Sequence, residues 1–413
     1  MTMTTTTTTK GREKMNNAEY IEYEERLTPM NYHPAPVVIS RGEGVWVWDL
    51  EGNKYLDMLA GYSALSFGHG HPKILEAAFA QAKKLCVISR AFHSDVFAQF
   101  AEKLTGLTGM DMVLPMNSGA EAVETCVKCA RKWAYTVKGV PLNQAEIIVC
   151  KRNFHGRTTT VVSFSTTEQY KHYFGPHTPG FKIIPFGDAK ALGEAITPNT
   201  AAFLFEPVQG EGGVNVPPDG YLKEVRSICD ENNVLMIADE VQTGMGRTGR
   251  VWACQHEDVM PDLYCLGKAL GGGMYPVSAA VGNKDVLGIF EPGDHGSTFG
   301  GNPLACAIGL ASMQVLEEEN LCENSTKMGE YFREGVCAMK SPLLCDVRGK
   351  GLLNAVEFKP EAGTAHDYIE PFLKVGILTK DTVEQVLRFT PPLTITQEEI
   401  DWALGRIERV LCP

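Results

Sequence analysis

Apolar residues recur along most of this chain in two patterns, one with a helical period and one of short continuous runs. From about residue 72 the two patterns alternate, which predicts an α/β large domain with a mostly parallel mixed sheet flanked by helices. The helical periods lie at 72–85, 94–107, 119–137, 219–233 and 303–318. The apolar runs expected to form strands lie at 112–115, 146–150, 182–185, 202–205, 234–238, 263–266 and 277–281.

The regions on either side of this alternating part show other patterns of apolar and polar positions. Residues 44–49 and 54–58 alternate apolar and polar positions on either side of a short turn, which predicts a β-hairpin. Near the other end, the pattern predicts a helix, three strands and a last helix, at 321–340, 352–358, 377–379, 386–389 and 397–411. We expect this part to form a smaller α+β domain that closes over the first.

These patterns divide the chain into four segments. Residues 1–17 include a threonine run from Thr4 to Thr9 and are expected to be a disordered tail. Residues 18–60 form the N-terminal segment with the hairpin, residues 61–305 the large domain and residues 306–413 the C-terminal small domain.

Composition and charge narrow the class of protein. Hydrophobic residues at 44% and charged residues at 21% are ordinary for a soluble globular protein. The formal net charge of −12 argues against general affinity for nucleic acid. No run of about 18 apolar residues is present, so we expect no membrane span. The N-terminal region is poor in arginine and contains acids, which favours the cytoplasm over a mitochondrial destination.

The 12 cysteines are scattered, and several fall inside apolar runs. This distribution predicts reduced, core-filling thiols and no disulfide framework. Cys126 and Cys129 are spaced as C-x-x-C inside a helical period, but no second pair stands at zinc-ligand spacing. We therefore expect core or redox-sensitive thiols there, and no metal site.

Three polar residues follow the carboxyl ends of predicted strands, where open α/β sheets bind ligands: Glu206, Asp239 and Lys268. Apolar surroundings lower the pKa of a lysine and make its amine nucleophilic. An aspartate at a neighbouring strand end can keep a pyridinium nitrogen protonated. Lys268 and Asp239 therefore supply the minimum chemistry for pyridoxal phosphate, an amine for a Schiff base and an acid for the ring nitrogen.

Two segments are candidate phosphate sites. Ser118, Gly119 and Ala120 open the 119–137 helical period, and the free N–H groups of a helix N-terminus bind phosphate well. The alternative is an ordinary serine N-cap. Ser297 and Thr298 stand in a glycine-rich turn before the next helix, where a second set of phosphate contacts or a plain loop would fit.

Phe154, His155 and Arg157 follow the predicted strand 146–150. An aromatic ring there can stack on a flat cofactor, and an arginine can grip a carboxylate with two hydrogen bonds. Arg157 alone is more often part of a surface salt bridge.

A glycine pattern at 244–249 matches the G-x-G-x-x-G spacing of dinucleotide-binding loops. Asp239 and Glu240 stand just before it and would repel a pyrophosphate, and the residues that follow do not show a helical period. We therefore rank a nicotinamide-dependent dehydrogenase well below a pyridoxal-phosphate enzyme.

Several motifs, taken together and in order, resemble the class III aminotransferases, which belong to the fold-type I pyridoxal-phosphate enzymes. The resemblance runs from about residue 20 to the C-terminus. It rests on segments 118–122, 154–158, 206–213, 238–244, 266–273 and 296–303.

The resemblance implies roles for cofactor-binding residues. Lys268 forms the Schiff base, Asp239 pairs with the pyridinium nitrogen and Gln242 approaches the phenolic oxygen. Phe154 stacks on the ring with His155 beside it. The implied phosphate contacts come from Ser118, Gly119 and Ala120 and, from the partner subunit of a homodimer, from Ser297 and Thr298. The N-terminal segment is expected to pack with the small domain and with that partner.

Further segments, including 31–34, 61–64, 348–355 and 387–393, resemble the members of this family that use ornithine. This resemblance implies transfer of the δ-amino group of L-ornithine to 2-oxoglutarate in a ping-pong cycle. Tyr32 and Arg157 would hold the α-carboxylate end of the substrate, and Tyr62 would line the channel. Glu211 would pair with Arg388 in one half-reaction and release it in the other. N-acetylornithine or 4-aminobutyrate as donor, and a non-catalytic scaffold, remain alternatives.

Overall fold

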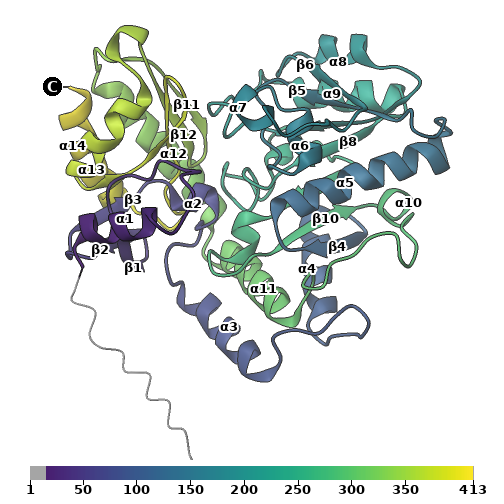
Figure 1. Cartoon of the computed structure of the whole chain (residues 1–413), viewed down its shortest axis with the longest axis horizontal. Helices are drawn as coiled ribbons and strands as arrows, with labels where there is room; N and C mark the ends of the chain where they lie inside the picture. The colour runs from purple at the N-terminus through teal and green to yellow at the C-terminus, as the bar shows by residue number, and fades with distance from the viewer. Residues whose placement is uncertain (1–14, 413) are drawn as a thin grey trace, which may run out of the picture.

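The protein, described here by a computed structural model covering residues 15–412, contains three β-sheets (Figure 1). The largest has seven strands, in the order β4-β10-β9-β8-β7-β5-β6. Their bounds are β4 (Met112–Met116), β5 (Glu146–Cys150), β6 (Phe181–Ile184), β7 (Thr200–Phe205), β8 (Leu235–Asp239), β9 (Leu263–Leu266) and β10 (Ser278–Gly282). Strands β5 to β9 pair in parallel, and β10 is antiparallel to both of its neighbours. The predicted mostly parallel mixed sheet is confirmed.

Strand β7 shows why these runs are continuously apolar. All six of its residues are buried. Alternate side chains of a strand point to opposite faces, and Phe203 and Phe205 pack in one apolar cluster while Ala202 and Leu204 pack in another. Helices therefore cover both faces of the sheet, as the alternation of patterns predicted.

The five helices predicted in the alternating part of the chain are all present. They are α3 (Pro72–Lys84), α4 (Phe97–Thr108), α5 (Gly119–Trp133), α9 (Tyr221–Glu231) and α11 (Pro303–Glu318). The prediction placed the end of α5 at 137. The helix instead continues beyond Trp133 as a π-turn, Ala134–Lys138, which stops at the left-handed Gly139. The short helices α6 (Thr159–Ser163), α7 (Glu168–Lys171), α8 (Ala189–Ala195) and α10 (Lys284–Leu287) were not predicted, because one or two turns show no clear period.

The smaller domain combines the two ends of the chain. One four-stranded sheet has the order β11-β12-β15-β14, with β11 (Leu344–Lys350), β12 (Leu353–Phe358), β14 (Lys380–Val383) and β15 (Val386–Phe389). The other has the order β1-β2-β3-β13, with β1 (Ile39–Glu43), β2 (Trp46–Asp49), β3 (Lys54–Asp57) and β13 (Ile377–Leu378). The predicted hairpin is β2 and β3, and β13 pairs with β3 in parallel. The helices of this domain are α12 (Leu321–Ala338), α13 (Ile369–Lys374) and α14 (Gln397–Leu411).

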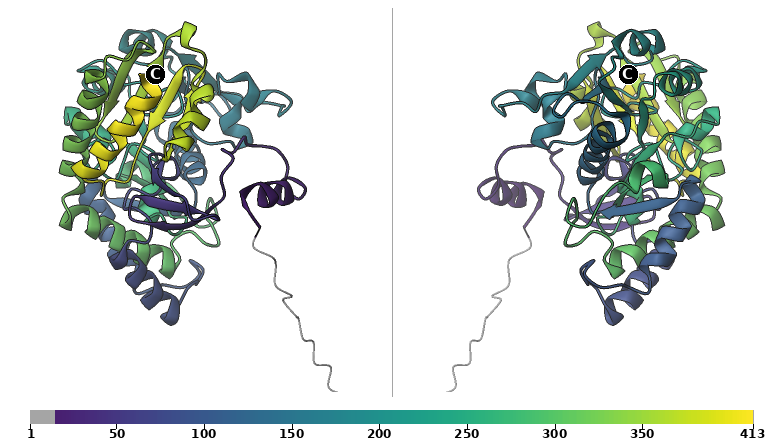
Figure 2. Two further views of the ribbon diagram at one scale, coloured as in Figure 1. Left: turned by 90° about the vertical axis from the view of Figure 1, so that its left-hand side faces the viewer. Right: turned by 90° about the vertical axis from the view of Figure 1, so that its right-hand side faces the viewer.

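The predicted disordered tail, residues 1–17, lies mostly outside the described part of the chain, and only its last residue falls in a helix. The described part begins at residue 15, and Asn17 is the first residue of helix α1 (Asn17–Glu25). The Asn16 side chain accepts a hydrogen bond from the Glu19 amide at 2.9 Å, and Glu19 accepts one from the Asn16 amide at 2.9 Å. This capping box fixes the start of the helix. Helix α1 buries none of its side chains and stands away from the body of the molecule (Figure 2).

All 12 cysteines are free thiols, and Cys126 and Cys129 are buried in α5 against backbone carbonyl groups. Within residues 15–412, no helix combines the length and the apolar character needed to cross a membrane.

Candidate active site

A cavity lies at the carboxyl ends of the parallel strands, between the sheet and the N-terminus of α5. Glu206 follows β7, Asp239 ends β8, and Lys268 follows β9 as the first residue of the 3₁₀ turn η3 (Lys268–Gly271). Parallel strands bring these ends together at one edge, so residues far apart in sequence share one site. The cavity is lined by Gly119, Ala120, Phe154, His155, Gly156, Glu206, Val208, Asp239, Val241, Gln242, Thr243 and Lys268.

Lys268 has a nucleophilic environment. Burial lowers the pKa of its amine to about 8, although the nearby negative charge of Glu211 acts in the opposite direction. Its backbone is left-handed, with φ of 44°, which is an uncommon conformation for a residue with a side chain. A larger fraction of this amine than of an ordinary lysine is therefore neutral near physiological pH.

This lowered pKa predicts how the amine reacts. We expect an amine-acylating reagent to label Lys268 of the cofactor-free protein half-maximally at about pH 8. The neutral form is the nucleophile, so labelling rises with pH, and a lowered pKa moves the rise to lower pH. Peptide mass spectrometry over a pH series measures it. An unstructured lysine peptide, with a pKa of about 10.4, is the control. Coincident profiles would contradict the expectation.

Asp239 and His155 form a buried pair. His155 Nδ1 lies 2.7 Å from Asp239 Oδ2, and the other oxygen, Oδ1, accepts a hydrogen bond from the Val241 amide at 3.1 Å. Burial alone would lower the pKa of His155, but the hydrogen bond to Asp239 and its charge outweigh this effect, and the pKa is raised. The pair therefore favours a protonated imidazole beside the Asp239 carboxylate.

Glu206 connects two loops that line the cavity. Its Oε2 accepts a hydrogen bond from the Phe154 amide at 3.0 Å, and its Oε1 accepts one from the Gly210 amide at 3.2 Å. Burial raises the pKa of Glu206 to about 7, against the effect of the nearby His155. The sequence placed Glu206 at a strand end but did not identify it as a site residue, since its partners are backbone amides of distant loops.

The N-terminus of α5 meets the cavity at Gly119. A Cβ atom on Gly119 would lie 2.7 Å from Cγ1 of Val241, so only glycine allows this close approach. Ser118 is an N-cap whose Oγ accepts a hydrogen bond from the Glu121 amide at 3.3 Å. Gly119 and Ala120 line the cavity as the first residues of the helix.

Arg388 and Glu211 form an ion pair beside these residues. Arg388, which is fully buried, donates through Nη1 to Glu211 Oε1 at 2.7 Å and to Gln242 Oε1 at 3.2 Å. Gln242 in turn donates to Glu211 Oε1 at 3.4 Å. The guanidinium carbon lies 5.1 Å from the centre of the Tyr62 ring. Among the described residues, Nε and Nη2 of Arg388 have no hydrogen-bond partner.

Eight of the predicted site residues do not line this cavity: Ser118, Tyr32, Tyr62, Arg157, Glu211, Ser297, Thr298 and Arg388. Tyr32 is 61% exposed, and the Arg157 guanidinium lies 4.3 Å from the centre of the Tyr170 ring. Ser297 accepts a hydrogen bond from the Asn117 side chain at 2.8 Å, and Thr298 is exposed.

The glycine pattern at 244–249 forms an internal turn. The next helical element is the short 3₁₀ turn η2 (Ala253–Glu257), so the pattern does not open an α-helix as a dinucleotide loop does. Arg247 from this turn is fully buried and donates to the carbonyl groups of Leu352 at 3.0 Å and Pro391 at 2.6 Å. The turn therefore joins the large domain to the small one.

Comparison with known proteins agrees with this geometry. Residues 27–411 match the family described as Aminotransferase class-III. The chain belongs to the class III aminotransferases. The resemblance found in the sequence is thereby confirmed, and this class III aminotransferase is an enzyme that transfers amino groups.

Individual relatives of this class III aminotransferase cover almost the whole chain. It is 56% identical over 392 residues to an ornithine aminotransferase of Geobacillus sp. (strain WCH70), covering 95% of this chain and 98% of the relative. A Toxoplasma gondii ME49 ornithine aminotransferase structure matches with a TM-score of 0.94 and 46% identity, covering 96% and 95%. An acetylornithine aminotransferase structure from Elizabethkingia anophelis matches with a TM-score of 0.87 and 48% identity, covering 96% and 99%.

Proposed function

We propose that this enzyme transfers the δ-amino group of L-ornithine to 2-oxoglutarate, with pyridoxal 5′-phosphate as its cofactor. The products are glutamate 5-semialdehyde and glutamate. The observation that carries the proposal is the buried Arg388–Glu211 pair at 2.7 Å beside the reactive lysine. Such a pair suits an enzyme that must accept two differently charged substrates in one site.

The residues of the cavity fit this cofactor. The N-terminus of α5 approaches closely at Gly119, where no Cβ can be placed, and it would hold the phosphate through the amides of Gly119 and Ala120. Phe154 and Val241 line the cavity and would pack on the ring. The Asp239 carboxylate would meet the ring nitrogen, and Gln242 the phenolic oxygen.

When bound, the cofactor supplies a carbonyl group that takes up an amine and a ring that accepts the electron pair of a breaking C–H bond. Lys268 would hold the cofactor through its Nζ, and the same Nζ, once free, would take up and return the proton of the substrate carbon. Asp239, whose Oδ2 lies 2.7 Å from His155 Nδ1, would keep the ring nitrogen protonated.

The Arg388–Glu211 pair adapts the site to the two substrates. Ornithine presents an amine next to the ring, where an unpaired arginine would be repulsive, so Glu211 covers Arg388 in the first half-reaction. 2-Oxoglutarate presents a carboxylate there, and Arg388 has two donor nitrogens, Nε and Nη2, without partners in residues 15–412. Release of Glu211 would free one donor hydrogen of the third nitrogen, Nη1, which keeps its hydrogen bond to Gln242. Tyr32, Tyr62 and Arg157 would hold the distant end of the substrate.

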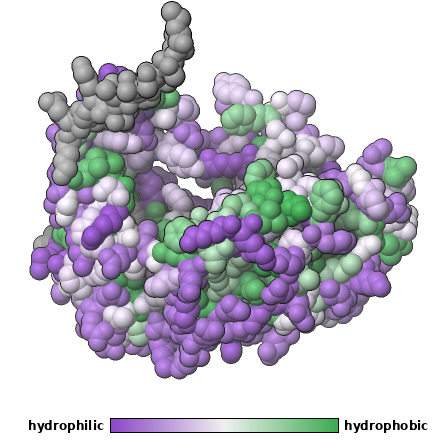
Figure 3. All heavy atoms as spheres, turned by 90° about the horizontal axis from the view of Figure 1, so that it is seen from below, coloured by the Kyte–Doolittle hydropathy of each residue, from purple (hydrophilic) through white to green (hydrophobic). Residues whose placement is uncertain are grey.

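We infer that the enzyme works as a homodimer in which Ser297 and Thr298 reach the phosphate of the partner's cofactor. Neither residue lines the cavity of its own chain. Helix α3 and the segment after it expose Phe79, Leu85, Val87 and Phe92, and Figure 3 shows apolar side chains gathered on this underside of the molecule. Apolar residues exposed together mark a protein interface.

A panel of donors tests the function. Ornithine, N-acetylornithine and 4-aminobutyrate are compared by kcat/KM at a fixed concentration of 2-oxoglutarate. We expect ornithine to be preferred, since acetylation replaces the charged α-amino group and 4-aminobutyrate lacks it. Preference for either other donor would overturn the proposal and leave the aminotransferase family membership intact.

A half-reaction assay tests the effect of Glu211→Ala: holoenzyme is mixed with one donor and no 2-oxoglutarate, because glutamate and 2-oxoglutarate together give no net product. Without Glu211, Arg388 stays unpaired in the site, and we expect kcat/KM for glutamate as amino donor to rise about tenfold while that for ornithine falls. Asp230→Ala, at a carboxylate paired with Arg226 on α9, is the control. Unchanged turnover of both donors by Glu211→Ala would show that the pair does not select substrates.

A further inference from the structure

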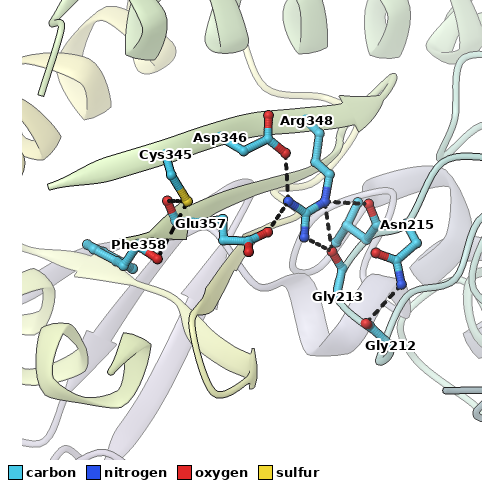
Figure 4. A network of polar contacts seen from close by, with 9 residues as sticks. Gly212, Gly213, Asn215, Cys345, Asp346, Arg348, Glu357 and Phe358 are labelled. Atoms are coloured by element: carbon cyan, nitrogen blue, oxygen red, sulfur yellow. Dashed lines mark hydrogen bonds and ion pairs between the residues drawn. The ribbon is translucent and has the colours of Figure 1, made fainter. Parts of the chain in front are cut away.

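A second arginine of the small-domain sheet, Arg348 on β11, contacts the loop that carries Glu211. Its Nε donates to the carbonyl groups of Gly213 at 3.1 Å and Val214 at 3.2 Å, and its Nη2 donates to Gly213 at 2.6 Å. Figure 4 shows the side chain reaching from the strand to this loop. These contacts cross from the small domain to the large one, two and three residues beyond Glu211.

Two carboxylates hold the guanidinium of Arg348 in place. Its Nη1 donates to Asp346 Oδ2 at 2.7 Å and to Glu357 Oε2 at 2.5 Å, from the same strand and from β12 (Figure 4). All three nitrogens of the guanidinium are therefore engaged. Because the guanidinium is planar and its Nη1 is held by carboxylates, its Nε and Nη2 donors point in one fixed direction. The ammonium group of a lysine has no such fixed geometry.

Arg348 and Arg388 occupy one row of the sheet. Arg348 on β11 is the register partner of Ala355 on β12, and Ala355 is the register partner of Arg388 on β15. Directly paired residues of antiparallel strands project to the same face. The two arginines, two strands or about 10 Å apart, therefore approach the same loop, one through its carbonyl groups and the other through the Glu211 carboxylate.

The loop between these contacts is a compact turn. Gln209 and Asn215 exchange two backbone hydrogen bonds at 3.0 Å, and the Gly213 and Val214 amides both donate to the Gly210 carbonyl. The Thr382 hydroxyl donates to the Glu211 carbonyl at 2.5 Å. Because the turn is closed on itself, displacing its Gly213 end also displaces Glu211.

We propose that Arg348 is a positioning residue that holds the turn 209–215 where Glu211 can cover Arg388, and so maintains discrimination between ω-amino and α-amino donors. This inference rests on the proposed function, in which Glu211 covers Arg388 for one substrate only. Arg348 touches neither Glu211's carboxylate nor the cavity, so its effect passes through the backbone of the turn.

The test compares Arg348→Gln, and Arg348→Lys as the milder variant, with wild-type holoenzyme in the half-reaction assay. We expect Arg348→Gln to lower kcat/KM for ornithine about tenfold and to leave that for glutamate unchanged or higher, as expected from losing charged hydrogen bonds. Arg348→Lys should lie between. Arg226→Gln is the matched control, because Arg226 is equally half-buried between two carboxylates, Asp230 and Asp262.

Two further measurements separate positioning from general support. In a Glu211→Ala background, Arg348→Gln should no longer change the ratio of the two donors. Hydrogen–deuterium exchange of the amides at 209–215 should increase in Arg348→Gln and stay unchanged in Arg226→Gln. The role of Arg348 would be overturned by any of three results. These are equal losses of kcat/KM for both donors, a change in the donor ratio that persists in the Glu211→Ala background, and unchanged hydrogen–deuterium exchange at 209–215.

Failure of the proposed function would look different. If the wild-type enzyme takes no amino group from ornithine, the assigned donor is wrong. The exchange measurement, and the ratio of glutamate to the donor that the panel identifies, still decide whether Arg348 positions the turn.

Discussion

Lys268→Ala is expected to lower transamination at least about 10⁴-fold, the upper range of what a positioned proton-transfer group contributes. The variant loses both the amine that anchors the cofactor and the group that moves the proton. Steady-state rates with ornithine and 2-oxoglutarate measure the loss. Lys182→Ala, on β6 in an ion pair with Glu146 of β5, is the control and should retain near wild-type activity.

The covalent role of Lys268 has its own readout. Borohydride reduction of the wild-type holoenzyme should fix the cofactor to the peptide that contains residue 268, and reduction of Lys268→Ala should fix none. A label on another lysine, or activity within about tenfold of wild type in the variant, would contradict the assignment.

Asp239→Asn is expected to lower kcat/KM about 10²- to 10³-fold. Removing one preorganised electrostatic group from an active site costs about 10²- to 10³-fold in rate, or roughly 2.7–4 kcal/mol of transition-state stabilisation. Asparagine keeps the shape but cannot hold a proton on the ring nitrogen. It also removes the negative charge that raises the pKa of His155.

The control for this variant is Asp262→Asn. Asp262 stands just before β9, at the opposite end of the sheet from the cavity, and bonds Arg226 and the Met236 amide. We expect it to affect stability but not the donor reaction. A loss below about tenfold in Asp239→Asn would show that this carboxylate is not required for catalysis.

The sequence predicted the large domain well, because its strands are apolar on both faces and its helices are long. It also predicted Asp239 and Lys268 as neighbours, since the carboxyl ends of adjacent parallel strands meet. Strands β11 and β14 escaped prediction because β11 carries polar residues such as Asp346 and Arg348 and neither strand buries any residue. The position of Arg348 in one row with Arg388 follows only from the register of the sheet, which the sequence does not show.

Other contacts depend on side-chain orientation that no pattern reveals. The sequence analysis placed His155 beside Phe154, but the pairing of His155 with Asp239 follows from how two loops fold over β8. Glu206 binds backbone amides of both loops, and amides are present at nearly every position. A side chain whose partners are backbone amides therefore produces no pattern that a single sequence could show.

The pairing of β3 with β13 has a consequence for how this protein is made. Leu56 emerges early in synthesis, but its register partner, Ile377, is added close to the end of the chain. One edge of the hairpin therefore stays unpaired while the intervening domain is synthesised and folds. Pairing of two segments so distant in sequence is slow. During that interval a charged residue on the open edge strand, Lys54 of β3, opposes pairing with another chain.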